Sequence, residues 1–137
     1  ELKNVIINYL KDEGFDVEDM GAVVYDKDDN YPEIMMPVAM RVLADPENIR
    51  AIVLGKSGNG EAMFLNRFPG IRAALYHGGN LEILRLSRRD NDANILSLAG
   101  SIVNEEEAKE AVKIWIATPF SGEERYVKRN NMMDNIE

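Results

Sequence analysis

The chain has 137 residues, and 45% of them are hydrophobic, which suits one globular domain over residues 1–137. Sixteen basic and 24 acidic residues give a net charge of −8, which argues against a nucleic-acid partner because such a partner requires a basic face. The chain has no cysteine and a single histidine, His77, so it offers neither disulfides nor a multi-histidine metal site. No apolar run approaches the roughly 20 residues that span a bilayer, and no signal-peptide pattern appears. We therefore expect a cytoplasmic protein without membrane contact.

The chain opens directly in a helical pattern. Apolar residues recur at helical spacing from Leu2 onward, and Gly14 is a typical stop signal. No capping residue precedes this helix. We therefore expect the native protein to have a segment upstream of Glu1.

The next segments are less regular. Alternating apolar and acidic residues over 15–21 predict a short strand, and the polar stretch 25–32 predicts a loop. A helix is expected over 33–44, where Pro37 forces either a late start or a kink.

The second half alternates buried strands with helices. Continuous apolar runs typical of parallel strands lie at 49–55, 71–77 and 93–100. Helices are expected between them, at 59–67 and 79–89. This alternation predicts a three-layer αβα sandwich with a Rossmann-like, mainly parallel sheet.

The end of the chain contains two predicted helix starts. Asn104 followed by Glu107 forms a capping-box pattern, and Ser121 followed by Glu124 forms a second one. The second box is expected to open a last helix that runs to about residue 136.

The stretch "AIVLGKSGNGEAM", residues 51–63, joins a predicted strand to a predicted helix. Its glycines at 55, 58 and 60 let a ligand approach the main chain, whose N–H groups then cradle an anion. Ser57 adds a hydroxyl donor, and Glu61 falls in the first turn of the helix. The stretch is not a P-loop, because Arg50 occupies the position of its first glycine. A tight turn with a solvated glutamate remains the structural alternative.

Four motifs in order, "NYP", "GKSGNGEAM", "NRFPGIRAAL" and "SRRDNDANILSLAG", resemble the ribose-5-phosphate isomerase B and galactose-6-phosphate isomerase family. The resemblance covers essentially the whole chain. It implies an aldose–ketose isomerase that acts on a sugar phosphate through a cis-enediol intermediate, without metal or organic cofactor. It also implies a homodimer or tetramer whose active sites are assembled from two subunits.

The resemblance assigns roles to individual residues. Glu61 would be the catalytic base, and Ser57 would help to stabilise the enediolate oxygen. Arg125 and Arg129, four apart on the last predicted helix, would clamp the phosphate. The residues that would bind the rest of the substrate are Tyr31, Gly58, Asn59, Gly60, Asp90 and Asn91.

Each role has a structural alternative. Asn91 in a loop before a strand is also a common turn residue. Tyr31 could be an aromatic anchor for its loop. The arginine pair could form an exposed basic face of its helix.

The chain departs from the family pattern at four positions. Histidines are common in the family at the positions of Asp90 and Tyr126, a basic residue at that of Ser101, and a glycine at that of Lys56. These departures favour a second function, a family member that binds a sugar phosphate without turning it over, whereas the intact Glu61 and Ser57 oppose it. A third candidate, a flavodoxin-like binder, needs phosphate-loop or flavin-stacking features that the sequence lacks.

Overall fold

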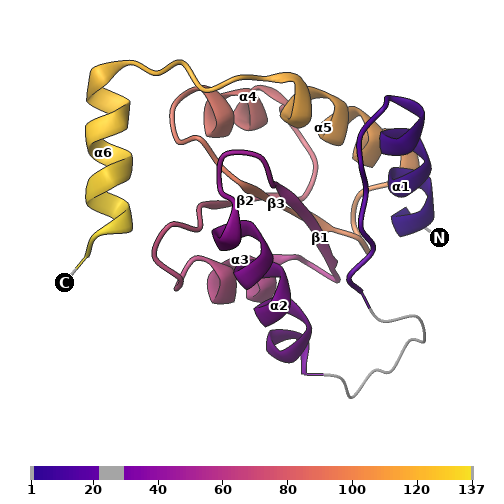
Figure 1. Ribbon diagram of the computed structural model, residues 1–137. Helices are drawn as coiled ribbons and strands as arrows, with labels where there is room; N and C mark the ends of the chain where they lie inside the picture. Colours follow the sequence, from indigo (N-terminus) through magenta and orange to yellow (C-terminus); the bar gives the residue numbers. More distant parts are fainter. Residues whose placement is uncertain (1, 22–29, 137) are drawn as a thin grey trace.

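The structure, a computed structural model, describes residues 2–21 and 30–136 (Figure 1). Six helices and three strands occupy these ranges. In chain order they are α1 (Leu2–Asp12), α2 (Tyr31–Ala44), β1 (Ala51–Gly55), α3 (Asn59–Leu65), β2 (Ala73–Tyr76), α4 (Glu82–Arg89), β3 (Ile95–Ala99), α5 (Glu105–Ala117) and α6 (Glu124–Asp134).

The strands form one parallel sheet in the order β1-β3-β2. Ser97 in the central strand pairs with Val53 on one side and with Leu75 on the other. Because all three strands run the same way, Gly55, Tyr76 and Ala99 end at one edge of the sheet, which we call the carboxyl edge. The opposite edge, where the strands begin, is the amino edge.

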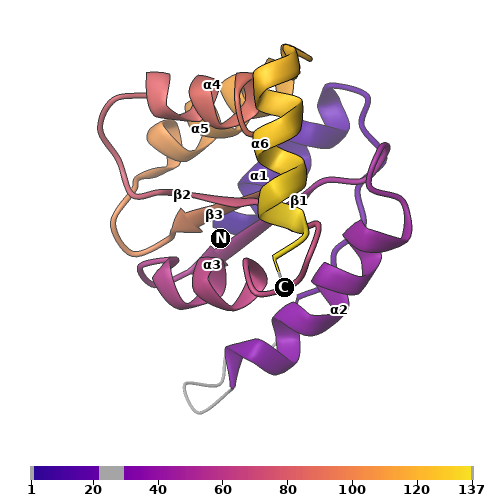
Figure 2. The same cartoon turned by 90° about the vertical axis from the view of Figure 1, so that its left-hand side faces the viewer.

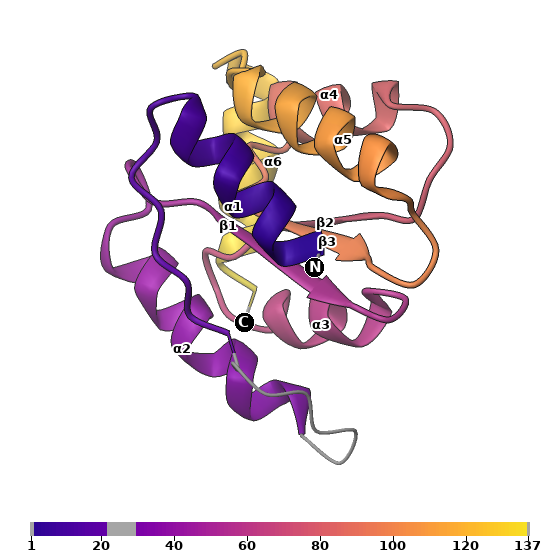
Figure 3. The ribbon, with the colours of Figure 1, turned by 90° about the vertical axis from the view of Figure 1, so that its right-hand side faces the viewer.

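Helices cover both faces of the sheet, so the predicted three-layer sandwich is confirmed (Figures 1 and 3). Helices α1, α4 and α5 cover one face, and α2 and α3 cover the other. The core of the first face includes Ile6, Leu10, Leu84, Leu96, Leu98 and Trp115. The core of the second includes Met35, Val42, Val53, Leu65 and Ile95. Each such buried side chain contributes about 1.5–3 kcal/mol to stability.

Helix α6 belongs to neither layer. Figure 1 shows it at the far left of the molecule, and Figure 2 shows it from its exposed side. Asn130 is its only buried residue, whereas Val127, Met132 and Met133 are exposed. Apolar burial within this chain therefore does little to hold α6.

The strand expected at 15–21 is wrong, because these residues form no regular structure. Val17 packs against the core of one face and Met20 against the core of the other, so the segment passes from layer to layer. Asp19 also binds Lys3 in α1 at 3.1 Å.

Two expected helix starts also differ from the structure. Helix α2 begins at Tyr31, because Pro32 fits the first turn, where no N–H is needed. The helix also continues through Pro37, so this proline does not delay its start. Helix α6 begins at Glu124 without a capping box. Gly122 has a φ of +75° there, and the Ser121 hydroxyl accepts a hydrogen bond from the N–H of Glu123 instead.

Among the helices of residues 2–21 and 30–136, none has the length and apolar character needed to cross a membrane.

Candidate functional site

The loop between β1 and α3 is fixed to the neighbouring strand. Gly58 has a φ of +79°, and a Cβ there would lie 2.7 Å from Cδ1 of Leu75. The buried hydroxyl of Ser97 donates to the Gly58 carbonyl at 2.9 Å. At the start of the loop, the N–H of Gly100 donates to the carbonyl of Gly55 at 2.7 Å. Two hydrogen bonds therefore tie the loop to β3 and to the residue that follows it.

Glu61 points back over this loop from the first turn of α3. Its carboxylate lies so close to Gly55 that a Cβ on Gly55 would collide with both oxygens. The residue is half-buried, and its carboxylate has neither a hydrogen bond nor an ion pair within the described ranges. The structure thus leaves a carboxylate that is available to accept a proton.

Hydrogen-bond donors surround the same position. The Ser57 oxygen accepts a hydrogen bond from the N–H of Asn59 at 3.2 Å, which leaves the hydroxyl hydrogen free to donate. The N–H groups of Gly58 and Gly60 have no acceptor in the part of the chain that the structure describes. These three donors suit an oxygen that gains negative charge.

Tyr31 packs directly on the loop from the first residue of α2. A Cβ on Gly60 would lie 2.5 Å from the Tyr31 hydroxyl oxygen. The tyrosine is 42% exposed, so one side of its ring faces solvent. Tyr31 therefore closes one side of the loop, and glycine at position 60 makes this close contact possible.

The loop after β2 completes the carboxyl edge. The Tyr76 hydroxyl donates to the carbonyl of Gly79 at 2.9 Å. Burial raises the pKa of Tyr76, and the carboxylate of Glu107 adds to the rise. The phenol therefore stays a protonated donor at neutral pH. His77, the next residue, is exposed.

The two arginines of α6 converge on one aromatic ring. The guanidinium carbon of Arg125 lies 4.7 Å from the ring centre of Tyr126, and that of Arg129 lies 5.7 Å from it. Cation–π contacts at partly exposed sites contribute about 0.5–1 kcal/mol each. The ion pair of Arg125 with Glu123 at 3.4 Å is exposed at both ends and contributes little. Tyr126 therefore holds two positive charges side by side.

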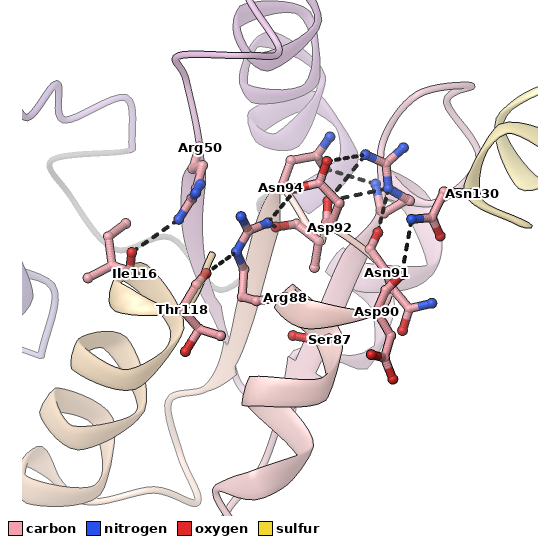
Figure 4. A network of polar contacts seen from close by, with 12 residues as sticks. Arg50, Ser87, Arg88, Asp90, Asn91, Asp92, Asn94, Ile116, Thr118 and Asn130 are labelled. Carbon is pink, nitrogen blue, oxygen red and sulfur yellow. Dashed lines mark hydrogen bonds and ion pairs between the residues drawn. The ribbon is translucent and has the colours of Figure 1, made fainter. Parts of the chain in front are cut away.

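Asp90 and Asn91 lie between α4 and β3, close to α6. Figure 4 shows the Asn130 side chain reaching Asp90, whose carbonyl accepts its amide hydrogen bond at 3.1 Å. The carbonyl of Asn91 accepts a hydrogen bond from Nε of Arg72 at 2.7 Å. The carboxamide of Asn91 is exposed and has no partner among the residues described. It is thus free to bind a sugar hydroxyl.

The structure sorts the candidate residues into two groups. The glycine-loop group lies at the carboxyl edge and consists of Tyr31, Ser57, Gly58, Asn59, Gly60 and Glu61. The arginine-helix group lies at the amino edge and consists of Asp90, Asn91, Arg125 and Arg129. At about 3.3 Å per residue, β3 alone separates the two edges by about 13 Å. One chain does not bring Glu61 to the arginines.

Sequence reasoning missed two residues that support these groups. Ser97 is a polar residue inside an otherwise apolar strand, and that interruption was a usable signal for its bond to the glycine loop. Arg72 carried no comparable signal, because its contacts with Asn91 and Asp134 join segments far apart in the sequence.

The described ranges contain no group of three or more histidine, cysteine, aspartate or glutamate side chains that could hold a metal ion.

A family model described as Ribose/Galactose Isomerase matches residues 1–133 of the chain. The ribose-5-phosphate isomerase B of Mycobacterium tuberculosis strain H37Rv is 37% identical over 137 residues, covering 100% of this chain and 83% of that protein. The D-erythrulose-4-phosphate isomerase of Pectobacterium atrosepticum is 30% identical over 122 residues, covering 89% of this chain and 78% of that protein.

Solved structures show the same fold. A ribose 5-phosphate isomerase from Thermotoga maritima superposes with a TM-score of 0.88 at 35% identity, covering 98% of this chain and 90% of that one. The ribose-5-phosphate isomerase B of Mycoplasma genitalium, solved with bound ribulose 5-phosphate, gives a TM-score of 0.90 at 28% identity, with 97% and 86% covered.

Proposed function

The chain belongs to the Ribose/Galactose Isomerase family, and from this membership we propose that it interconverts ribose 5-phosphate and ribulose 5-phosphate. It is an aldose–ketose isomerase of sugar phosphates, as its close curated relatives are. The observation that carries the proposal is the unpaired carboxylate of Glu61, held over Gly55 beside free N–H and hydroxyl donors.

In the proposed reaction, Glu61 removes the proton from C2 of the open-chain aldose. The C2–H electrons form the C1–C2 double bond, and the carbonyl electrons move to O1. Ser57 and the N–H groups of Gly58 and Gly60 stabilise the negative charge on O1. The O2 proton then passes to O1, and Glu61 returns its proton to C1, which gives the ketose.

The second part of the proposal concerns the phosphate. A five-carbon sugar phosphate does not span the sheet, so the Arg125–Arg129 pair of the same chain cannot hold it near Glu61. We propose that a second copy supplies the arginine-helix group, and that the protein is a homodimer with two composite sites.

Helix α6 supports this assembly. Val127, Met132 and Met133 are 39%, 65% and 47% exposed, and Ile136 just beyond the helix is 80% exposed. Exposed apolar side chains of this number on one helix are typical of a protein interface.

A direct substrate assay tests the proposed activity. Incubation with ribose 5-phosphate should produce ribulose 5-phosphate, and in deuterated water the label should appear at the C2 position of recovered ribose 5-phosphate. D-erythrulose 4-phosphate is the second substrate to compare, because a relative with that name is 30% identical to the chain. Unphosphorylated ribose serves as the control and should turn over far more slowly.

The departures at Asp90 and Ser101 favour one alternative, a family member that binds a sugar phosphate without isomerising it. Calorimetry that detects binding of ribose 5-phosphate, together with no turnover and no deuterium exchange, would support that alternative and contradict the proposed activity.

Tyr126 gives a separate prediction for the phosphate clamp. Tyr126→Leu should raise the KM for ribose 5-phosphate about 3- to 10-fold with a smaller change in kcat, because two cation–π contacts are lost. Tyr126→Phe keeps the ring and is the matched control, with a KM close to that of wild type. An equal rise in KM for both variants would assign the effect to the hydroxyl instead.

A further inference from the structure

We propose that Arg72 is a positioning residue that fixes α6, with its arginines, and the substrate asparagine Asn91 as one unit. The inference rests on the proposed function, because it assumes that Arg129 binds phosphate and Asn91 binds sugar. Arg72 itself precedes β2 at the amino edge and touches neither the Asn91 carboxamide nor the guanidinium group of Arg129. It acts through the main chain of Asn91 and through the end of α6.

Helix α6 needs such an anchor. Asn130 is its only buried residue, so its orientation within one chain depends on polar contacts. One is the Asn130 amide bond to the Asp90 carbonyl at 3.1 Å, visible in Figure 4. The other is the ion pair between Arg72 and Asp134, near the last turn of the helix.

The Arg72–Asp134 pair has the geometry of a strong contact. Nη1 of Arg72 donates to both oxygens of Asp134, at 2.9 and 2.7 Å. The two side chains are only 14% and 23% exposed, so water competes weakly for them. Partly buried, charge-assisted bonds of this kind are stronger and more directional than exposed ion pairs.

The other edge of the same guanidinium holds the Asn91 loop. Nε of Arg72 donates to the carbonyl of Asn91 at 2.7 Å, and Nη2 donates to that of Asp92 at 3.2 Å. Asp92 has a positive φ of 49°, so this tight turn depends on its neighbours to keep its shape. One planar side chain thus binds the loop and the helix at once.

Arg72 is itself firmly placed. Its N–H donates to the side-chain oxygen of Asn94 at 2.8 Å, and its carbonyl accepts from the N–H of Asn94 at 2.9 Å. Asn94 is 5% exposed and also donates to the carbonyl of Gly70 at 2.8 Å. Figure 4 shows Asn91, Asp92 and Asn94 gathered at the start of β3. These bonds to Asn94 therefore hold Arg72 at the amino edge of the sheet.

A helix transmits a shift at its end to its whole length. Asp134 lies five residues after Arg129, or about 7.5 Å along the axis. If the Arg72 contact is lost, only the Asn130–Asp90 bond still sets the distance between Arg129 and Asn91, so the spacing between the phosphate site and the hydroxyl site is less well fixed. Misplacement by about 1 Å can cost up to about 100-fold in catalysis.

Asp134→Asn tests the inference without altering the core. We expect the KM for ribose 5-phosphate and the inhibition constant of inorganic phosphate to rise together, about 10-fold, with a smaller change in kcat. The direction is diagnostic. Removal of a negative charge from the helix that carries the two arginines would by itself tighten phosphate binding, whereas a loss of positioning weakens it.

Four further variants complete the experiment. Asp134→Glu should recover most of the affinity, and Arg72→Lys, which keeps the charge but not the planar fork, should raise KM in the same direction. Arg72→Lys combined with Asp134→Asn should be no worse than the stronger single variant, because both disrupt the Arg72–Asp134 pair. Asp12→Asn, at an exposed position at the end of α1, is the matched charge control and should leave KM unchanged.

Two outcomes would overturn the inference, and they are distinguishable. If Arg129→Ala raises KM strongly while Asp134→Asn lowers only the melting temperature, then the contact is merely structural and the proposed function stands. If instead Arg129→Ala leaves KM unchanged, then the phosphate clamp of the proposed function is wrong, and the positioning role of Arg72 is wrong with it.

Discussion

Glu61→Gln is expected to lower kcat about 10²- to 10⁴-fold, because the amide cannot take the proton from C2. The change is nearly isosteric, and the Glu61 carboxylate has no partner within the described ranges that the variant would break. Folding and substrate binding should therefore persist, with a KM and melting temperature near those of wild type. The measurements are steady-state isomerisation of ribose 5-phosphate and deuterium exchange at C2, which should fall in parallel.

Gly55→Ala provides a second way to disturb the same carboxylate. A Cβ at this position collides with the Glu61 carboxylate, so the variant should lower kcat while leaving the glutamate present. Glu110→Gln, an exposed carboxylate of α5, is the matched control with unchanged kcat. Normal turnover by Glu61→Gln would show that another group moves the proton, and would remove the basis of the proposed mechanism.

The sheet and the last core helix could be predicted from the sequence, because local pattern and tertiary packing agree there. The continuous apolar runs became β1, β2 and β3, each between helices as expected. Asn104 and Glu107 form both bonds of their capping box at 2.8 and 2.9 Å. In these segments, the residues that favour the element are also the residues that the core or the helix end requires.

The segments that were predicted wrongly lack this agreement. The alternation in 15–21 suited a strand, but no neighbouring strand pairs with it, and its apolar side chains pack on two different layers. Ser121 carried a capping signal, but the positive φ of Gly122 turns the chain before α6 starts. The residue pattern of a segment does not show whether a neighbouring strand or a backbone N–H lies close enough to pair with it.

In the candidate site, too, features carried by adjacent residues could be predicted, whereas contacts between distant segments could not. The glycine loop was recognisable because its glycines and Glu61 are adjacent in sequence. That Gly55 accommodates the Glu61 carboxylate, and Gly60 the Tyr31 ring, follows only from the fold. The separation of Glu61 from Arg129 also depends on chain topology. The predicted order of strands and helices places the glycine loop after a strand and Asn91 before one, but it does not place the last helix relative to the sheet.

This separation makes a mixing experiment decisive. Glu61→Gln and Arg129→Ala homodimers should each be nearly inactive, but together they should recover activity after chain exchange. In a mixed dimer, one composite site carries both defects and the other carries none. Random pairing makes half of the dimers mixed, so activity should return to about a quarter of the wild-type value. Co-expression with two different affinity tags, followed by purification of the mixed dimer, would raise this to about half.

The matched control pairs two defects from the same group. Glu61→Gln mixed with Ser57→Ala should show no recovery above the average of the two, because both residues lie on the glycine loop and no site in the mixed dimer is intact. Recovery therefore depends on defects that lie at opposite edges of the sheet. If Glu61→Gln and Arg129→Ala chains exchange freely and still fail to complement each other, both residues act within one chain. Helix α6 would then have to leave the amino edge, breaking the Arg72–Asp134 pair, to reach the glycine loop of its own subunit.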